Sequence, residues 1–302
     1  MRWRKLGPTL LPTARPAWMH SHAALPFAEP MQGSICRIYF SARDRLNRSH
    51  TGWVIIDLSE PGRVLEISAD PVLSPGSLGY FDDSGAMLAW ICHQGDRRML
   101  YYIGWNLGVT VPFRNAIGLA ISDGSEPFRR YSPGPIVDRT PFEPHFVGSC
   151  CVLPDSGLWR MWYLACVDWE MRNEKPHHRY HLRYAESTDG IAWRRTGAVA
   201  IGLRDSSEYA ISRPSVVRDP DCWRMWYSHR GSHYLIGYAE SPDGRAWTRH
   251  DDRAGIGLSP SGWDSEMIEY PHVFDQGGCR FMLYNGNGFG RTGFGLAMHE
   301  ER

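Results

Sequence analysis

The sequence predicts an all-β fold, namely a five-bladed β-propeller whose four-stranded antiparallel blades surround an axial funnel. Three observations lead to this prediction. Residues 184–195 return nearly unchanged as residues 238–249, and an aromatic strand motif recurs five times along the chain. No long segment keeps the 3.6-residue apolar period of an amphipathic helix. The flanking segments are short, aromatic and β-branched, and glycine, proline or aspartate bounds them, which is typical of strands and turns.

The five copies of the strand motif define the repeat. Trp159–Tyr163 and Trp223–Tyr227 both read Trp-Arg-Met-Trp-Tyr, and looser copies give strands centred near residues 39, 101, 162, 226 and 283. A unit of four strands repeated radially forms a β-propeller, which leaves few strand edges exposed. Because the repeat crosses every plausible boundary, we expect one domain over residues 1–302.

A turn of characteristic composition follows the strands. The two long copies share Tyr-Ala-Glu-Ser-x-Asp-Gly-x-Ala-Trp, with the glycine at Gly190 and Gly244. Glycine adopts positive φ without strain, and serine and aspartate side chains bond nearby backbone N–H groups. We therefore expect a tight hairpin turn over which Trp193 or Trp247 packs.

Composition and charge narrow the classes of function. Lys and Arg total 33, as do Asp and Glu, so the chain has no overall charge that would attract nucleic acid or an anionic membrane. No apolar segment approaches the length of a bilayer span. The seven cysteines lie mostly in strand-like segments, and the basic, proline-rich residues 1–18 do not read as a secretory signal. These features predict a cytoplasmic protein with no nucleic-acid or membrane partner.

The repeated motifs resemble those of the five-bladed propeller glycosidases: the invertase, levansucrase, arabinanase and β-xylosidase families, with the mannoside phosphorylases near them. The shared features are Arg-x-Trp/Leu-Tyr strands followed by Tyr-Ala-x-Ser-x-Asp-Gly-x-x-Trp hairpins, over about residues 20–298. The resemblance implies an active site in the axial funnel, into which the innermost strand of each blade points its first residues. It also implies catalytic carboxylates helped by arginine and often by histidine.

Ionisable residues lie at or just before every expected innermost strand, in phase with the repeat. Counting back from the strand motif places these strands at 20–25, 87–91, 148–153, 212–217 and 270–274. Glycoside cleavage requires one protonated and one ionised carboxyl group. The expected catalytic carboxylates are Asp83, Glu208 and Glu269. The expected substrate-binding residues are His22, Glu143, Arg213 and His272.

Local motifs refine these assignments. Glu269 opens a Glu-Tyr-Pro sequence that resembles the Glu-Cys-Pro of the family, in which the glutamate is the acid. Glu143 begins Glu-Pro-His, which resembles the Glu-Ala-Pro-His of arabinanases. Arg213 precedes a proline, which predicts an extended backbone at that residue. The chain departs from the family at residues 19–22, where the first-blade carboxylate is missing.

Together these features predict a carbohydrate-active, glycoside hydrolase-like enzyme that cleaves a small glycoside or a nucleotide- or phospho-activated sugar, for example in surface-glycan metabolism. No cofactor and no metal are expected. Two alternatives remain open: a non-catalytic sugar-binding propeller, and a metal-dependent enzyme that uses His20, His22, His145 and His272. The polar segment 170–181 is expected to form a loop at the funnel rim.

Overall fold

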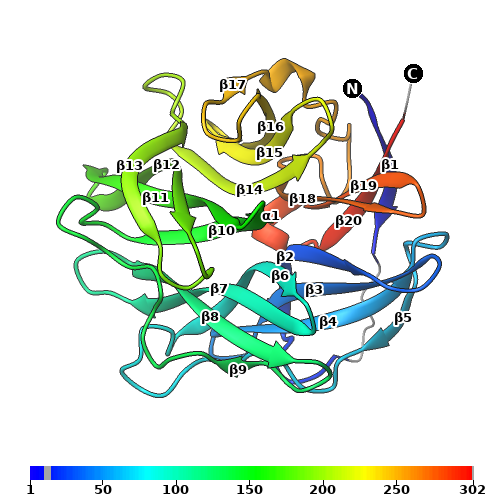
Figure 1. Ribbon diagram of the computed structural model, residues 1–302, viewed down its shortest axis with the longest axis horizontal. Helices are drawn as coiled ribbons and strands as arrows, with labels where there is room; N and C mark the ends of the chain where they lie inside the picture. Colours follow the sequence, from blue (N-terminus) through cyan, green and yellow to red (C-terminus); the bar gives the residue numbers. More distant parts are fainter. Residues whose placement is uncertain (10–14, 301–302) are drawn as a thin grey trace. The chain divides into compact units, whose positions relative to one another are not determined.

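The computed structural model describes residues 1–9 and 15–300, and β-strands make up most of them (Figure 1). The chain forms two compact units. Unit 1 consists of Met1–Val72 and Pro214–Arg302, and unit 2 of Leu73–Arg213. Within the described ranges, helix is confined to a 3₁₀ turn, η1 (Asp251–Arg253), and the short α1 (Asn287–Gly290). The prediction of an all-β fold is confirmed, and neither of these helices has the length or the apolar character needed to cross a bilayer.

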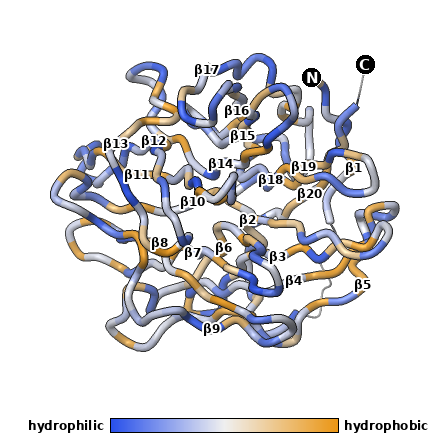
Figure 2. The backbone as a smooth tube through the Cα atoms, in the orientation of Figure 1, coloured by the Kyte–Doolittle hydropathy of each residue, from blue (hydrophilic) through white to orange (hydrophobic). Residues whose placement is uncertain are grey.

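Strands that follow one another in the chain pair antiparallel, and each such run is termed a meander, numbered in chain order. Unit 2 contains two of them. Meander 2 comprises β6 (Gly85–Gln94), β7 (Arg97–Leu107), β8 (Phe113–Asp123) and β9 (Arg129–Arg130). Meander 3 comprises β10 (Val147–Asp155), β11 (Leu158–Arg172), β12 (Lys175–Ser187) and β13 (Arg194–Ile201). Hydrophobic residues are concentrated on strands such as β8, and hydrophilic residues on many of the connections (Figure 2).

Unit 1 contains the other three meanders. Meander 1 comprises β2 (Ser21–Pro30), β3 (Ile35–Arg43), β4 (Ser49–Asp57) and β5 (Val64–Ile67). Meander 4 comprises β14 (Ala210–Arg218), which begins in unit 2, β15 (Trp223–Arg230), β16 (Tyr234–Ser241) and β17 (Thr248–Arg249). Meander 5 comprises β18 (Glu269–Gln276), β19 (Cys279–Asn285), β20 (Phe294–His299) and β1 (Trp3–Pro8).

The fourth strand of meander 5 comes from the other end of the chain. β1 pairs antiparallel with β20 (Figure 1). In this ladder Trp3 lies opposite His299. Trp3 packs edge-on against Trp226, with ring centroids 5.7 Å apart. The first described strand is therefore fixed both by a hydrogen-bonded ladder and by a buried aromatic contact.

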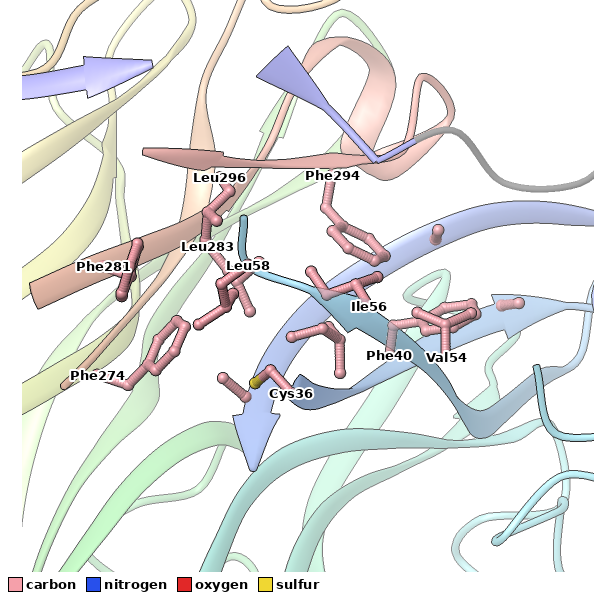
Figure 3. Close-up of a cluster of buried hydrophobic side chains, with 14 of the residues drawn as sticks. Cys36, Phe40, Val54, Ile56, Leu58, Phe274, Phe281, Leu283, Phe294 and Leu296 are labelled. Carbon is pink, nitrogen blue, oxygen red and sulfur yellow. The ribbon is translucent and has the colours of Figure 1, made fainter. Parts of the chain in front are cut away.

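The core of unit 1 follows from the two-residue period of its strands, because alternate side chains leave a strand on the same face. Phe40 of β3 and Ile56 of β4 are fully buried in one cluster with Leu283, Phe294 and Leu296 of meander 5 (Figure 3). Burial of each such side chain contributes about 1.5–3 kcal/mol. This cluster fixes meanders 1 and 5 within unit 1.

The expected hairpin turn is present. Ser187 Oγ accepts the N–H of Gly190 at 2.9 Å, and Asp189 Oδ1 accepts the N–H of Ala192 at 2.9 Å. Gly190 has a φ of 75°, which lies in the left-handed region that favours glycine. The second copy, residues 241–246, makes the same two bonds. The turn chemistry read from the sequence is confirmed in both copies.

The expectation of a rim loop at residues 170–181 is wrong, because that segment continues β11 and β12 as a long hairpin. Trp169 lies opposite His178, and the two rings meet edge-on with centroids 5.3 Å apart. Asn173 and Glu174 form the turn, and both have positive φ. Cross-strand aromatic pairs stabilise antiparallel ladders, so this polar sequence folds as sheet.

Candidate functional site

The first strand of each meander has irregular backbone near its start. The pairing register shifts near the start of four of these strands, at Ser21/Ala24, Leu88/Trp90, Gly148/Cys150 and Glu269/His272. Positive φ values mark the same part of the repeat at His22, Ser149, Arg213 and Tyr270. Bulges re-aim side chains and are common beside active sites. The predicted residues His22, Arg213, Glu269 and His272 all lie at or beside such a position.

The expected extended backbone at Arg213 is wrong. Arg213 has a φ of 49°, and Tyr270, which also precedes a proline, has a φ of 56°. Both residues occupy the irregular position of their strand. The backbone conformation at the irregular start of these strands therefore overrides the local preference for extended backbone before proline.

Arg213 is fully buried at a point where first strands of meanders approach each other in unit 2. Its guanidinium donates to the backbone carbonyl of Ala89 in β6. Burial raises the pKa of Cys150 in β10 to about 12, and the charge of Arg213 opposes that rise. A cation from β14 thus lies beside both β6 and β10.

Glu143 is buried, and its carboxyl oxygens accept hydrogen bonds from three donors. Its Oε1 accepts from the Tyr163 hydroxyl at 2.7 Å and from Arg183 at 2.9 Å. Its Oε2 accepts from Arg195 at 2.8 Å. These donors come from β11, β12 and β13, so Glu143 ties the loop before β10 to the rest of meander 3. Its expected role in binding substrate stays a prediction.

The same kind of network recurs in phase with the repeat. In meander 5, Asp264 accepts from the Tyr284 hydroxyl at 3.0 Å and pairs with Lys5 at 2.6 Å. In meander 2, Asp82 pairs with Arg130 at 2.7 Å, beside Tyr102. In each case a buried carboxylate pairs with a cation of the fourth strand and lies beside a tyrosine of the second strand. These acids recur at the same place in these repeats because each one links a loop to the strands of its own meander. Their spacing therefore does not require a catalytic role.

Meander 1 has neither the second-strand tyrosine nor the acid of this network. Phe40 stands at the position of the second-strand tyrosine, and the sequence before β2 contains no Asp or Glu. A phenyl ring has no hydroxyl to donate, so a buried carboxylate there would lose one of its usual partners. Meander 1 thus lacks both the carboxylate and the tyrosine of this network.

Two further predicted carboxylates contact backbone groups of their own loops. Asp83 is half-buried and accepts from Asn106 at 2.7 Å and from the N–H of Gly79 at 3.1 Å. Burial works to raise the pKa of Asp83, but these bonds outweigh it and hold the pKa below the usual value. Glu208 is buried, and its Oε2 accepts the N–H of Arg204 at 2.7 Å. Their expected catalytic roles stay predictions.

Glu269 is different from these acids. It is fully buried at the start of β18, and neither carboxyl oxygen has a hydrogen-bond donor in bonding geometry among the described residues. Burial raises the pKa of Glu269 well above its usual value, against the opposing influence of Arg230 and Tyr270. Burial therefore favours the protonated form of this carboxyl group. His272, three residues along the strand, packs its ring on Phe27 at a centroid distance of 4.1 Å.

A cationic cluster surrounds His22 in unit 1. Burial, Arg43 and Arg291 together lower the pKa of His22 to about 4, so the imidazole is neutral at pH 7. Arg43 lies opposite Ser21 in the β2–β3 ladder. Burial lowers the pKa of Arg43, the charge of Arg291 lowers it further, and Tyr270 acts in the opposite direction. Two guanidinium groups beside a neutral imidazole favour an anion and disfavour a metal cation.

Sequence reasoning missed Arg43 and Arg230, although the repeat contains the signal. Both follow the strand motif as Ser-x-Arg, at residues 41–43 and 228–230. Ser228 also belongs to this region, because its hydroxyl accepts the N–H of Tyr270 at 2.7 Å. Unit 1 thus combines His22, Arg43, Arg230, Glu269 and Tyr270 around the irregular starts of β2 and β18.

Comparison with known proteins gives relatives of two kinds. Two curated sequences from Mycobacterium tuberculosis, "Uncharacterized protein MT1551" of strain CDC 1551 / Oshkosh and "Uncharacterized protein Rv1502" of strain ATCC 25618 / H37Rv, are each 48% identical over 99% of this chain and 100% of their own length. No family model matches the chain.

Solved structures share the fold at low sequence identity. A glycoside hydrolase superposes with a TM-score of 0.76 and 17% identity, covering 99% of this chain and 92% of that chain. A thermostable family-43 glycoside hydrolase gives a TM-score of 0.67 with 15% identity over 95% and 93% of the two chains. A structure from the GH130 family of mannoside phosphorylases gives 0.69 with 12% identity over 99% and 93%. The resemblance to the propeller glycosidases is confirmed at the level of the fold.

Proposed function

The chain belongs to the same family as the two mycobacterial proteins. Because its fold is that of glycoside hydrolases, we propose that it is an enzyme that cleaves a small glycoside or an activated sugar. In this proposal the five meanders are the blades of one propeller domain over residues 1–302, with an axial funnel. We also propose a cytoplasmic location, which the seven cysteine thiols, five of them buried, support.

The observation that carries the proposal is the fully buried carboxyl group of Glu269, whose pKa burial raises well above the usual value. A general acid must hold its proton at the working pH and give it to the leaving oxygen as the glycosidic bond breaks. Burial of the carboxyl group favours the first condition, and the register shift between Glu269 and His272 places the residue at the irregular start of β18. We assign Glu269 the role of general acid.

The cationic cluster of His22, Arg43 and Arg291 supports an activated substrate. A phosphate or nucleotide diphosphate carries the negative charge that two guanidinium groups and a neutral imidazole N–H can bind. An uncharged glycoside would leave these guanidinium groups close together without an anion. We therefore propose a phospho- or nucleotide-activated sugar ahead of a neutral glycoside.

The test compares leaving groups. Purified enzyme is screened for sugar release from nucleotide sugars and 4-nitrophenyl glycosides, and Glu269→Gln is then measured on active substrates with good and poor leaving groups. Loss of proton donation should lower kcat by at least about a hundredfold where the leaving group is poor, and far less where it is good. An equal loss on both kinds of substrate would contradict the assignment of the acid.

Glu143→Gln is the matched control, because Glu143 is a buried carboxylate whose two oxygens already have protein donors. It should change stability without the dependence on leaving group. Absence of turnover on the whole panel, together with measurable sugar binding, would replace the proposed enzyme by a non-catalytic sugar-binding protein.

A further inference from the structure

A cleft lies on unit 2, and neither Glu269 nor the cluster of His22, Arg43 and Arg291 lines it. It is lined by the β7–β8 hairpin, by the loop before β10 and by the β11–β12 hairpin, and its volume is about 220 Å³. The residues that matter below are Phe113, Arg114, Asn115, His145, Phe146 and Trp169.

One wall of the cleft is an aromatic cluster with a fixed arrangement. Phe113 and Phe146 meet edge-on at a centroid distance of 5.3 Å, and Trp169 lies 5.8 Å from Phe113 and 5.7 Å from Phe146. His178 contacts Trp169 and stacks on Tyr180 at 4.9 Å, which braces the tryptophan from the next strand. Trp169 and Phe113 are half-buried, so part of each ring remains available to a ligand.

The polar groups of the cleft are available as well. Arg114, Asn115 and His145 make no side-chain hydrogen bond or ion pair to any residue in the described ranges. Their neighbours differ in this respect, because Asn106 donates to Tyr80 and Asp83, and Arg139 pairs with Asp138 at 3.6 Å. Three planar hydrogen-bonding side chains thus line the cavity beside an aromatic wall.

We propose that this cleft binds one sugar ring, with the ring's C–H face on Trp169 and Phe113 and its hydroxyl groups on Arg114, Asn115 and His145. Aromatic faces pack on apolar ligand surface, and the three polar side chains supply donors and acceptors around its edge. Ligand pockets usually enclose about 300–1,000 Å³, so this smaller cavity fits a monosaccharide unit better than a nucleotide. Only the choice of a saccharide rests on the proposed function.

The test measures binding and does not depend on catalysis. Methyl glycosides of glucose, galactose, mannose and arabinose are titrated into the full chain by calorimetry and by saturation-transfer NMR. We expect at least one of them to bind, and Trp169→Ala to weaken that binding at least tenfold. Asn115→Ala, at a half-buried position with no protein partner, should weaken it without disturbing the fold as seen by circular dichroism.

Two controls separate this site from the proposed catalytic residue. Arg97 lies at the other end of the same β7–β8 hairpin and bonds to Asp123. Arg97→Ala should therefore leave sugar binding unchanged. Glu269→Gln should also leave it unchanged, so loss of activity and loss of this binding are independent results. Binding by none of the four glycosides, binding that ignores both Trp169→Ala and Asn115→Ala, or preferential binding of uridine or adenosine at this cleft would each overturn the proposal.

Discussion

Glu269 makes its own contribution to the pH dependence of stability. An unfolded glutamate releases its proton near its ordinary pKa, whereas burial keeps the folded group protonated to higher pH. Its stabilising contribution is therefore complete below pH 4.5 and is lost as the pH rises through the folded pKa.

Between these two limits, the contribution of Glu269 to the free energy of unfolding should fall by about 1.4 kcal/mol per pH unit. Glu269→Gln should remove that fall, because glutamine has no proton to lose. Guanidinium denaturation of both proteins from pH 5 to pH 8 measures the difference. Parallel stability curves for the two proteins would show that the carboxyl group is ionised in the folded state.

Glu143 gives the opposite expectation for a buried acid. Removing its charge leaves Arg183 and Arg195 without their anion, and breaking a buried ion pair typically costs about 3–5 kcal/mol. Tyr163→Phe removes only one hydrogen bond to the same carboxylate and should cost about 1–3 kcal/mol. Urea denaturation of Glu143→Gln and Tyr163→Phe tests this order, which a larger loss in the tyrosine variant would contradict.

At the scale of single elements, the Ser-x-Asp-Gly turn gives a direct test of backbone conformation. Gly190 has a φ of 75°, and a Cβ there would lie 2.8 Å from the Tyr101 hydroxyl and 3.1 Å from the Trp159 ring. Left-handed backbone alone costs a non-glycine residue about 1–2 kcal/mol.

Gly190→Ala should therefore lower the free energy of unfolding by more than that amount. Gly134→Ala is the control, because a Cβ at Gly134 meets nothing within 4 Å and its φ is not in the left-handed region. Thermal and chemical denaturation of both variants give the comparison, and equal stability of the two would rule out strain at Gly190.

The strands and turns were predictable from sequence, because their signals are local. Composition and repetition identify the strand Trp159–Tyr163 and the turn at 187–190. The irregular starts of β2 and β18 were not predictable, since a bulge is defined only by the residues opposite it in the partner strand. The extended pairing of residues 170–181 was missed because cross-strand contacts such as Trp169 with His178 outweigh the polar composition.

The candidate site was predictable only in part for the same reason. Counting along the repeat identifies Glu143 and Glu269 equally well, yet one has three donors and the other has none in bonding geometry among the described residues. That difference depends on side chains from β11, β12 and β13, far from Glu143 in the chain. Periodicity therefore locates the acids but does not separate acids with several donors from one whose pKa burial raises.

At the scale of the whole molecule, the seven cysteines should differ sharply in reactivity. Cys279 is exposed and Cys222 half-buried, while the other five are buried. Burial also raises the pKa of Cys36, Cys150 and Cys166 to about 12, so these thiols carry almost no thiolate.

A chromogenic disulfide reagent should therefore react rapidly with one thiol in the native protein and with seven in guanidinium. Cys279→Ser should abolish the rapid phase and leave the total in denaturant at six. Fast reaction of several native thiols would mean that the strands carrying the buried cysteines open readily.

The pairing of β1 with β20 has a consequence for the order of events during synthesis. β1 leaves the ribosome among the first strands, but the strand that it pairs with, through Trp3 and His299, is translated only after the intervening meanders. Domains generally begin to fold from the N-terminal side as they emerge, and pairings of long sequence separation form slowly. Meanders 2 and 3 can therefore assemble on the nascent chain, whereas β1 must wait with an unpaired edge. A tag or fusion that hinders β1 should act as a defect in the last step of maturation, leaving β20 open to strands from other chains.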